Sequence, residues 1–105
     1  MTEFKNVTIA KEANFYFDGN VTSRTIFFSD GSKKTLGIML PGNYEFTTEV
    51  KEVMEITAGE LEVLVSEKVG WKKMSKGMQF EVAKNSNFKL KVTKIFDYCC
   101  SYIEE

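Results

Sequence analysis

Histidine is absent from this sequence of 105 residues. Histidine titrates near neutral pH and is the commonest nitrogen ligand of metals, so its absence excludes imidazole-based acid–base catalysis and a histidine-ligated metal site. No apolar run approaches the roughly 20 residues that a membrane-spanning helix needs. The first ten residues include Glu3 and Lys5 and lack the apolar segment of a signal peptide, so we expect a cytoplasmic protein with no membrane partner.

Arginine is also scarce, because Arg24 is the only one in the sequence. The 14 Lys and Arg residues are balanced by 15 Asp and Glu residues, which gives a net charge of −1. Nucleic-acid-binding proteins usually carry a basic excess on one face, so this balance argues against a nucleic-acid partner. With 43% hydrophobic and 28% charged residues, the composition is that of one globular domain, which we assign to residues 1–105.

Only two cysteines are present, and they are adjacent, at Cys99 and Cys100. Neighbouring residues of a β-strand point to opposite faces of the sheet, so two thiols placed in this way would not form a disulfide with each other. We expect free buried thiols, which are typical of a reducing compartment; a vicinal redox switch is the alternative.

Turn-forming residues, by contrast, recur about every ten residues, in pairs such as Asp18-Gly19, Asp30-Gly31 and Pro41-Gly42. Such spacing is typical of many short strands. The candidate strands are Val21–Phe28, Thr35–Leu40, Tyr44–Thr48, Val53–Thr57, Leu61–Ser66, Gln79–Val82, Phe88–Thr93 and Phe96–Ile103.

Apolar and polar residues alternate in several of these segments. Phe88, Leu90 and Val92, for example, are separated by Lys89 and Lys91. Alternation of this kind predicts antiparallel sheets with one buried face. The predicted fold class is all-β, a compact double-sheet barrel of the jelly-roll type.

The first 17 residues are less regular than the rest. Val7, Ile9, Phe15 and Phe17 are apolar with a period of two. We expect residues 1–17 to form an arm that adds a strand to a sheet edge, either of its own chain or of a partner.

Two glycine-anchored segments carry a more specific signal. Their spacing, from Gly42 to Gly59 and from Gly77 to Val92, resembles the two motifs of the cupin family. In metal-binding cupins the first motif has two histidines and a glutamate, and the second has one histidine; here these positions hold Thr48, Val50, Glu52 and Phe88. One carboxylate cannot replace the roughly three ligands that a transition metal requires, so the sequence resembles a cupin barrel without its metal site.

A closer resemblance covers about four fifths of the chain, from near Asn14 to Tyr102. Its residues are Leu36-Gly-Ile-Met-Leu-Pro-Gly-Asn-Tyr-Glu-Phe46, Glu52–Val63, Trp71, Gly77–Val82, Ser86-Asn-Phe88 and Tyr98-Cys-Cys-Ser-Tyr102. In order and spacing this set resembles the pyrimidine/purine nucleoside phosphorylase family of small cupins. The resemblance implies phosphorolysis, in which a purine or pyrimidine nucleoside and inorganic phosphate give the free base and ribose 1-phosphate. It implies inorganic phosphate as the co-substrate and no cofactor.

This reaction passes through a sugar with oxocarbenium character, and the residues offer candidates for its parts. Glu52 is the catalytic candidate, because a carboxylate can bind the ribose hydroxyls or stabilise positive charge at the anomeric carbon. The candidates for substrate binding are Tyr44, Thr48, Phe88, Tyr98 and Tyr102. Tyr98, Cys100 and Tyr102 share one face of their strand, and aromatic faces can stack on either class of base. Each candidate also has a plain structural explanation, as a solvated strand end for Glu52 and as core packing for the aromatic residues.

The candidates for phosphate binding are the basic residues Arg24, Lys33 and Lys34. Arg24 lies on a predicted strand, whereas the two lysines follow the Asp30-Gly31 turn, where they would equally suit a solvated loop. We expect a homodimer. Two other functions remain open, a non-catalytic cupin that binds a small molecule or carbohydrate, and a purely structural dimerising module.

The absence of histidine leads to a first prediction, a protein that needs no metal. Treatment with a chelator should leave both its thermal stability and its activity unchanged, as measured by a melting curve and a rate assay. Stoichiometric zinc, iron or manganese that leaves the purified protein together with its activity would contradict this prediction.

Overall fold

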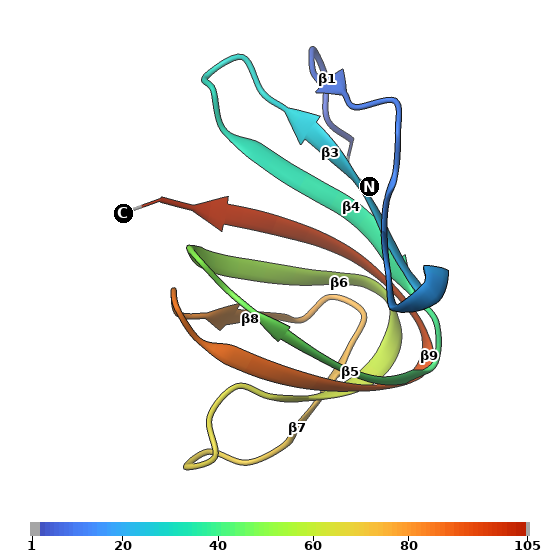
Figure 1. Ribbon diagram of the computed structural model, residues 1–105, viewed down its shortest axis with the longest axis vertical. Helices are drawn as coiled ribbons and strands as arrows, with labels where there is room; N and C mark the ends of the chain where they lie inside the picture. Colours follow the sequence, from blue (N-terminus) through green and yellow to red (C-terminus); the bar gives the residue numbers. More distant parts are fainter. Residues whose placement is uncertain (1–2, 105) are drawn as a thin grey trace.

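A computed structural model describes residues 3–104, and β-strands dominate it (Figure 1). Its strands are β1 (Thr8–Ile9), β2 (Asn14–Tyr16), β3 (Val21–Phe27), β4 (Lys33–Met39), β5 (Gly42–Thr47), β6 (Lys51–Leu64), β7 (Lys72–Ser75), β8 (Gln79–Val82) and β9 (Asn87–Ile103). One short 3₁₀ turn, η1 (Phe17–Gly19), follows β2. The predicted all-β class is therefore confirmed. Within the described range, no helical segment has the length and hydropathy of a transmembrane helix.

The two longest strands, β6 and β9, run antiparallel to each other and curve through the middle of the molecule (Figure 1). The first part of β9 pairs with β5, and its second part pairs with β4. Strands β3 and β4 consequently lie on one side of the pair, and β5 and β7 lie on the other (Figure 1). The result is the predicted cupin-type double sheet, although the sheet does not close into a complete barrel among the described strands.

The sequence predicts two strands where the structure has one long strand, both in β6 and in β9. The sequence predicts a break at Ala58-Gly59 because this pair is typical of turns, and a second break near Thr93-Lys94, where two polar residues follow each other. The structure instead carries the ladder through these points, with register shifts between Ile56 and Leu61. Such bulges bend a strand and increase its twist, which lets one strand serve both sheets. The sequence did not predict β7 at all, because Met74 is its only buried residue and gives no alternation.

The hydrophobic core lies between the two sheets and takes residues from both. The period of two predicted for β9 is confirmed, since its buried side chains include Phe88, Leu90, Val92, Phe96 and Tyr98. Cys99 and Cys100 are both free and buried. Only Cys100 belongs to the core cluster, which is what strand alternation predicts for neighbouring residues.

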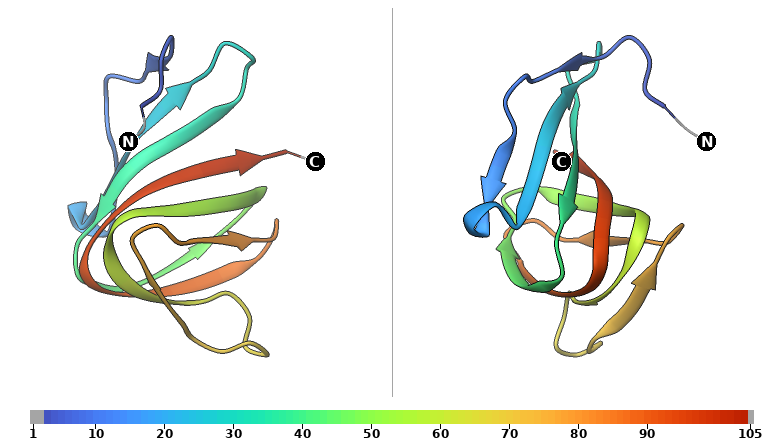
Figure 2. Two further views of the ribbon diagram at one scale, coloured as in Figure 1. Left: turned by 180° about the vertical axis from the view of Figure 1, so that it is seen from behind. Right: turned by 90° about the vertical axis from the view of Figure 1, so that its right-hand side faces the viewer.

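The N-terminal arm runs along the edge strand β3 of its own chain (Figure 2). Strand β1 pairs with the end of β3, and β2 pairs with its beginning, where Tyr16 lies opposite Val21. Phe17 then packs on the ring of Tyr44, with the ring centroids 5.1 Å apart. Residues 1 and 2 of the expected arm lie outside the described range. The arm therefore contacts the sheet through its pairing with β3 and contacts the hydrophobic core through Phe17.

The bulge in β6 leads to a prediction about stability. A Cβ atom at Gly59 would lie 2.8 Å from Cα of Phe96 and would also collide with the carbonyl oxygen of Ile95, at a backbone φ of +110°. Gly59→Ala should therefore lower the free energy of unfolding by roughly 3 kcal/mol, from the positive φ and the crowding together.

Gly70→Ala is the matched control, because Gly70 also has a positive φ, +81°, but no atom lies within 4 Å of its added Cβ. This variant should lose only about 1 kcal/mol. Urea denaturation of both variants measures the difference. Equal losses in the free energy of unfolding would show that crowding against Ile95 and Phe96 does not destabilise the Gly59→Ala variant.

Candidate functional site

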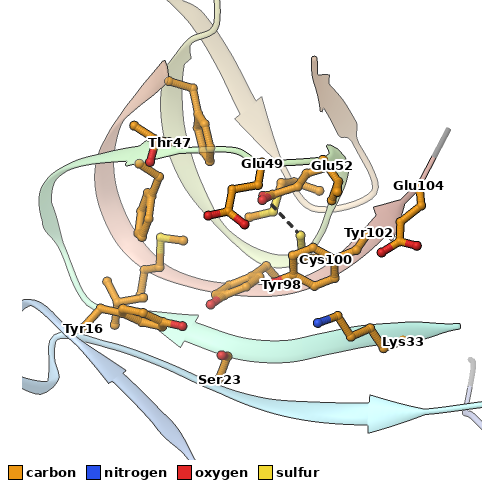
Figure 3. Close-up of a pocket in the computed structure, with 16 residues that line it drawn as sticks. Tyr16, Ser23, Lys33, Thr47, Glu49, Glu52, Tyr98, Cys100, Tyr102 and Glu104 are labelled. Atoms are coloured by element: carbon orange, nitrogen blue, oxygen red, sulfur yellow. Dashed lines mark hydrogen bonds between the residues drawn. The ribbon is translucent and has the colours of Figure 1, made fainter. Parts of the chain in front are cut away.

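A cavity of about 430 Å³ opens between the two sheets (Figure 3). Its volume lies within the range of about 300–1,000 Å³ that is typical of sites for small molecules. Side chains of both sheets, of the N-terminal arm and of the C-terminal strand meet in it. The lining residues are Tyr16, Val21, Ser23, Lys33, Met39, Phe46, Thr47, Glu49, Val50, Glu52, Met54, Phe88, Tyr98, Cys100, Tyr102 and Glu104.

The cavity brings together five of the nine site residues that the sequence suggests: Glu52, Phe88, Tyr98, Tyr102 and Lys33. They come from strands that are far apart in the sequence, β4, β6 and β9. The predicted shared face of Tyr98, Cys100 and Tyr102 is confirmed, because all three line the cavity. These five residues are the part of the predicted site that the geometry supports.

Two of the remaining candidates, Tyr44 and Thr48, are buried but do not line the cavity. The Tyr44 hydroxyl donates a hydrogen bond of 2.6 Å to the carbonyl oxygen of Leu40. Burial raises the pKa of this phenol, so its proton stays in place. The Thr48 hydroxyl donates to the carbonyl oxygen of Ala83 at 2.6 Å and accepts from the backbone N–H of Ser86 at 3.0 Å. Both side chains hold loops, and the geometry gives their predicted binding roles no support.

The other two candidates, Arg24 and Lys34, lie on the outer face of the sheet. Ser23 and Lys33 line the cavity, so strand alternation turns Arg24 and Lys34, their neighbours in the sequence, away from it. The Lys34 ammonium group lies over the rings of Phe4 and Phe28, 5.4 and 5.8 Å from their centroids. Of the three predicted phosphate ligands, Lys33 alone reaches the cavity.

Glu52 lies near the start of β6, opposite Tyr102 in the register with β9. The Cys100 thiol donates a hydrogen bond of 3.5 Å to its carboxylate oxygen Oε1, drawn as a dashed line in Figure 3. Burial raises the pKa of Glu52, because removing the carboxylate from water disfavours its charged form; the thiol contact opposes this effect. Burial raises the pKa of Cys100 as well, so the thiol remains a neutral donor. Glu52 is therefore a partly desolvated acid that faces the cavity.

The two cavity tyrosines are fixed through their hydroxyl groups. The Tyr98 hydroxyl donates to the carbonyl oxygen of Thr22 at 3.3 Å, and the Tyr102 hydroxyl lies 3.1 Å from that of Thr35. Gly37, opposite Tyr98 in β4, makes the first contact possible, since a Cβ there would lie 2.6 Å from the phenol oxygen. Burial is the main reason that the pKa of both phenols is raised, so both remain neutral hydroxyl groups in the cavity wall.

The charges of the cavity are unequal, with three carboxylates against one ammonium group. Glu49, Glu52 and Glu104 line it, and Lys33 is the single basic side chain among the described residues that do. The Lys33 nitrogen lies 5.5 Å from the ring centroid of Tyr102. In the view of Figure 3, Lys33 and Glu52 lie on opposite sides of Tyr98 and Cys100. An anion in the cavity would find its favourable position at Lys33, and a cationic group would find it near the carboxylates.

An aromatic wall forms another part of the cavity. Phe46 and Phe88 are stacked, with ring centroids 5.6 Å apart and an angle of 25° between the rings. Tyr16 meets Phe46 edge to face at 6.5 Å and is 47% exposed. Phe88 is 3% exposed and supports Phe46 from behind, so Phe46 and Tyr16 are the rings of this wall that a planar heterocycle can reach.

Sequence reasoning missed several lining residues. Phe46 could have been found, because it is two residues from Tyr44 and therefore shares its strand face. The inward position of Tyr16 depends on how the arm packs. Glu49 lies in a bend and Glu104 follows the last strand, where no periodicity identifies the side that a residue faces.

No group of three or more Cys, Asp or Glu residues in the described range could hold a metal ion. What the cavity combines is a desolvated carboxyl group, an ammonium group and stacked aromatic rings. Such a set can bind a sugar with developing positive charge, an anion and a planar ring at the same time.

Comparisons with known proteins identify the family. The sequence model of the pyrimidine/purine nucleoside phosphorylase family matches residues 11–102. This chain belongs to that family. A relative from Chlorobium chlorochromatii, named pyrimidine/purine nucleoside phosphorylase, is 64% identical over 104 residues, which cover 98% of this chain and 99% of the relative. A relative of the same name from Wolinella succinogenes is 56% identical and covers 98% of both chains.

Solved structures agree with the family and the fold. The crystal structure of an Acinetobacter protein of unknown function superposes with a TM-score of 0.92 at 39% identity and covers 96% of this phosphorylase-family chain and 98% of its own. An RmlC-like cupin from Shewanella frigidimarina has a TM-score of 0.70 at 14% identity, covering 96% of this chain and 86% of its own. The second likeness bears on the fold alone and supports the cupin assignment.

Glu52 leads to a prediction about pH. Since the pKa of Glu52 is higher in the folded chain than in the unfolded one, the folded chain binds more protons between the two values. The free energy of unfolding should therefore fall as pH rises through this window, from about 4.3 upward. Glu52→Gln removes this contribution, so the stability of the variant relative to the native protein should increase over the same window and then stay constant. Urea denaturation between about pH 4 and pH 7 measures it; a difference that does not change with pH would contradict the prediction.

Proposed function

We propose that this protein is a nucleoside phosphorylase that converts purine or pyrimidine nucleosides and inorganic phosphate into the free base and ribose 1-phosphate. Membership of the family supports this activity. The observation that carries the proposal is the joining, in one cavity, of the Glu52 carboxyl, the Lys33 ammonium and the aromatic wall of Phe46 and Phe88. These groups match the three parts of the reaction, which are a sugar, an anion and a planar base.

Glu52 acts on the sugar. As the bond from C1′ to the base nitrogen lengthens, positive charge develops on the ribose ring. An ionised carboxylate in a partly desolvated cavity stabilises this charge more strongly than one in water. Burial makes the ionised form of Glu52 costly without substrate, and the developing cation offsets that cost in the transition state. The pKa of Glu52 then also sets a lower pH limit for activity.

Lys33 holds the attacking phosphate. One phosphate oxygen forms the new bond to C1′ while the bond from C1′ to the base breaks, and the electron pair of that bond leaves with the base nitrogen. The carboxylates of the cavity repel a phosphate anion, so the position of Lys33 apart from Glu52 provides a place for it. The proton that the leaving base takes up comes from a phenol, a carboxyl group or water, because the chain has no imidazole.

The base stacks on the aromatic wall. Stacking is tolerant of base identity because every base has a π-face, and it accounts for acceptance of both purines and pyrimidines. We further propose that the reaction needs no metal or cofactor. The protein acts in the cytoplasm as a homodimer; the two free thiols suit a reducing compartment.

A panel of purine and pyrimidine nucleosides, incubated with the protein in the presence and absence of phosphate, tests the activity. Chromatography should show free base only when phosphate is present. Thermal stabilisation by nucleosides without any release of base would favour the binding cupin instead, and the absence of both would favour a structural module.

Replacement of Glu52 by glutamine keeps the volume of the side chain and removes its charge. We expect kcat/KM to fall roughly 100-fold, the scale of losing one electrostatic stabiliser of a transition state. For the native protein, kcat/KM should rise with pH as Glu52 ionises, and the variant should lose this rise. Release of base at the native rate by a folded Glu52→Gln protein would remove Glu52 from the mechanism.

Adjacent lysines provide a matched test of the phosphate position. Lys33→Met removes the ammonium group from the cavity and should raise the KM for phosphate roughly tenfold or more, the scale of losing one charged contact. Lys34→Met changes the next residue, on the other face of β4, and should leave that KM near the native value. Saturation curves in phosphate at fixed nucleoside concentration measure both. A larger effect at Lys34 than at Lys33 would overturn the assignment.

A further inference from the structure

The carboxylate of Glu52 receives one side-chain hydrogen bond from the described part of the chain, and its donor is the Cys100 thiol. The Cys100 sulfur lies 3.5 Å from Oε1 of Glu52. No ion pair within residues 3–104 involves this carboxylate. The direction of the Glu52 side chain in the cavity therefore depends on its strand and on this thiol.

The register of the strands fixes the thiol in this place. Glu52 lies opposite Tyr102, and Met54 lies opposite Cys100, so Cys100 and Glu52 are diagonal neighbours on the cavity face of β6 and β9. Cys100 is 2% exposed and belongs to the hydrophobic core, whereas Glu52 is half-buried. The two side chains point toward each other in Figure 3. The donor is thus held by core packing, and the more exposed carboxylate adapts to it.

A thiol suits a carboxylate that must keep both its position and its charge. The S–H group is a weak donor, and it stays protonated because burial, and then the nearby Glu52 carboxylate, raise its pKa. It occupies Oε1 and draws little charge from the carboxylate. Oε2 receives no hydrogen bond from any described residue, so this oxygen is available to a ligand.

None of the other titratable groups around Glu52 forms a hydrogen bond or ion pair with it in the described range. They are Tyr16 of β2, Lys33 of β4, Glu49 in the bend before β6, Tyr98 and Tyr102 of β9, and Glu104 after β9. Strand β8 places the apolar Val82 opposite Glu52, and Lys51, next to it in β6, pairs with Glu81 at 3.0 Å. The two phenols of β9 are neutral, and water screens the exposed charges of the cavity mouth. Cys100 therefore has the most direct effect on Glu52.

We infer that Cys100 is a positioning residue for Glu52, because its thiol holds Oε1 and thereby presents Oε2 to the ribose ring in the cavity. The inference rests on the proposed function, in which Glu52 stabilises the developing sugar cation. Loss of the donor would let the carboxylate turn away from the ring. It would also favour the protonated carboxyl group, since a hydrogen bond to the charged form stabilises that form. Both effects reduce the fraction of molecules in which an ionised carboxylate faces the substrate.

Two substitutions separate the hydrogen bond of Cys100 from its packing. Cys100→Ala and Cys100→Ser leave similar gaps in the core, but only serine keeps a donor. Cys100→Ala should lower kcat/KM roughly threefold to tenfold and move the acid limb of its pH profile upward by about 0.5–1 pH unit, the scale of losing one modest hydrogen bond. Cys100→Ser should recover most of kcat/KM and keep the limb at or below its native pH. If the gap unfolds the alanine variant, Cys100→Val and Cys100→Thr give the same comparison with the gap filled.

Cys99→Ala is the matched control, because it removes the neighbouring thiol on the opposite face of the strand, where it lies beside Glu55. Cys99 is 4% exposed and therefore buried almost as completely as Cys100. This variant should keep the native kcat/KM and the native acid limb. A shift equal to that of Cys100→Ala would show that the loss of any buried thiol has this effect, and it would overturn the inference.

A titration without substrate separates this inference from the proposed function. The side-chain carboxyl carbon of Glu52, followed by NMR and assigned with Glu52→Gln, reports the pKa of this group directly. That pKa should be higher in Cys100→Ala than in the native protein or in Cys100→Ser. Equal pKa values in all three, or a pKa change that the acid limb does not follow, would overturn the positioning role. A native protein with the expected pKa values that releases no base would overturn the phosphorolysis and leave the effect of Cys100 on Glu52 standing.

Discussion

The pairing of β6 with β9 is the constraint on which the rest of this molecule depends. Each strand contributes to both sheets, and the bend that allows this lies at the register shifts between Ile56 and Leu61. At Gly59 the backbone approaches that of Ile95 and Phe96 too closely for any side chain. The bend separates the part of β9 that faces β5 from the part that faces β4, and the cavity forms between them. The position of Glu52 relative to Phe88, one on each long strand, follows from this one packing contact.

The chemistry of the cavity depends on how burial changes the pKa values of a small number of titratable side chains. The chain has no imidazole, and the titratable side chains that line the cavity offer carboxyl groups, phenols, one thiol and one amine. Burial keeps Tyr98, Tyr102 and Cys100 neutral. The charged groups of the cavity are Glu52, which is partly desolvated, and Lys33, Glu49 and Glu104, which are exposed to solvent. The same thiol that fills the core at Cys100 donates to Glu52, so the hydrophobic core and the cavity share a residue.

Much of this arrangement could be predicted from the sequence, and the reasons for the failures are physical. Alternation identified β9 and the shared face of Tyr98 and Tyr102, because a strand with one buried face shows a period of two. It could not show that β6 and β9 continue through their bulges, since a bulge breaks the period without ending the ladder. The sequence suggested Lys33 and Lys34 equally as phosphate ligands. The structure distinguishes them because Lys33 faces the cavity, whereas Lys34 lies on the opposite face of β4. The cavity position of Tyr16 depended on a contact between the arm and Phe46 that no local pattern contains.

The place of Tyr16 in the cavity wall has a thermodynamic consequence. The ring belongs to a strand of three residues, held to the edge of the sheet by its pairing with β3. A ligand that touches this ring binds only to molecules whose arm is in place, so its measured affinity includes the fraction of time that the arm spends there. By linkage, such a ligand should slow amide hydrogen exchange along Asn14–Tyr16. Ligand binding in the cavity is therefore coupled to the docking of the N-terminal arm on β3.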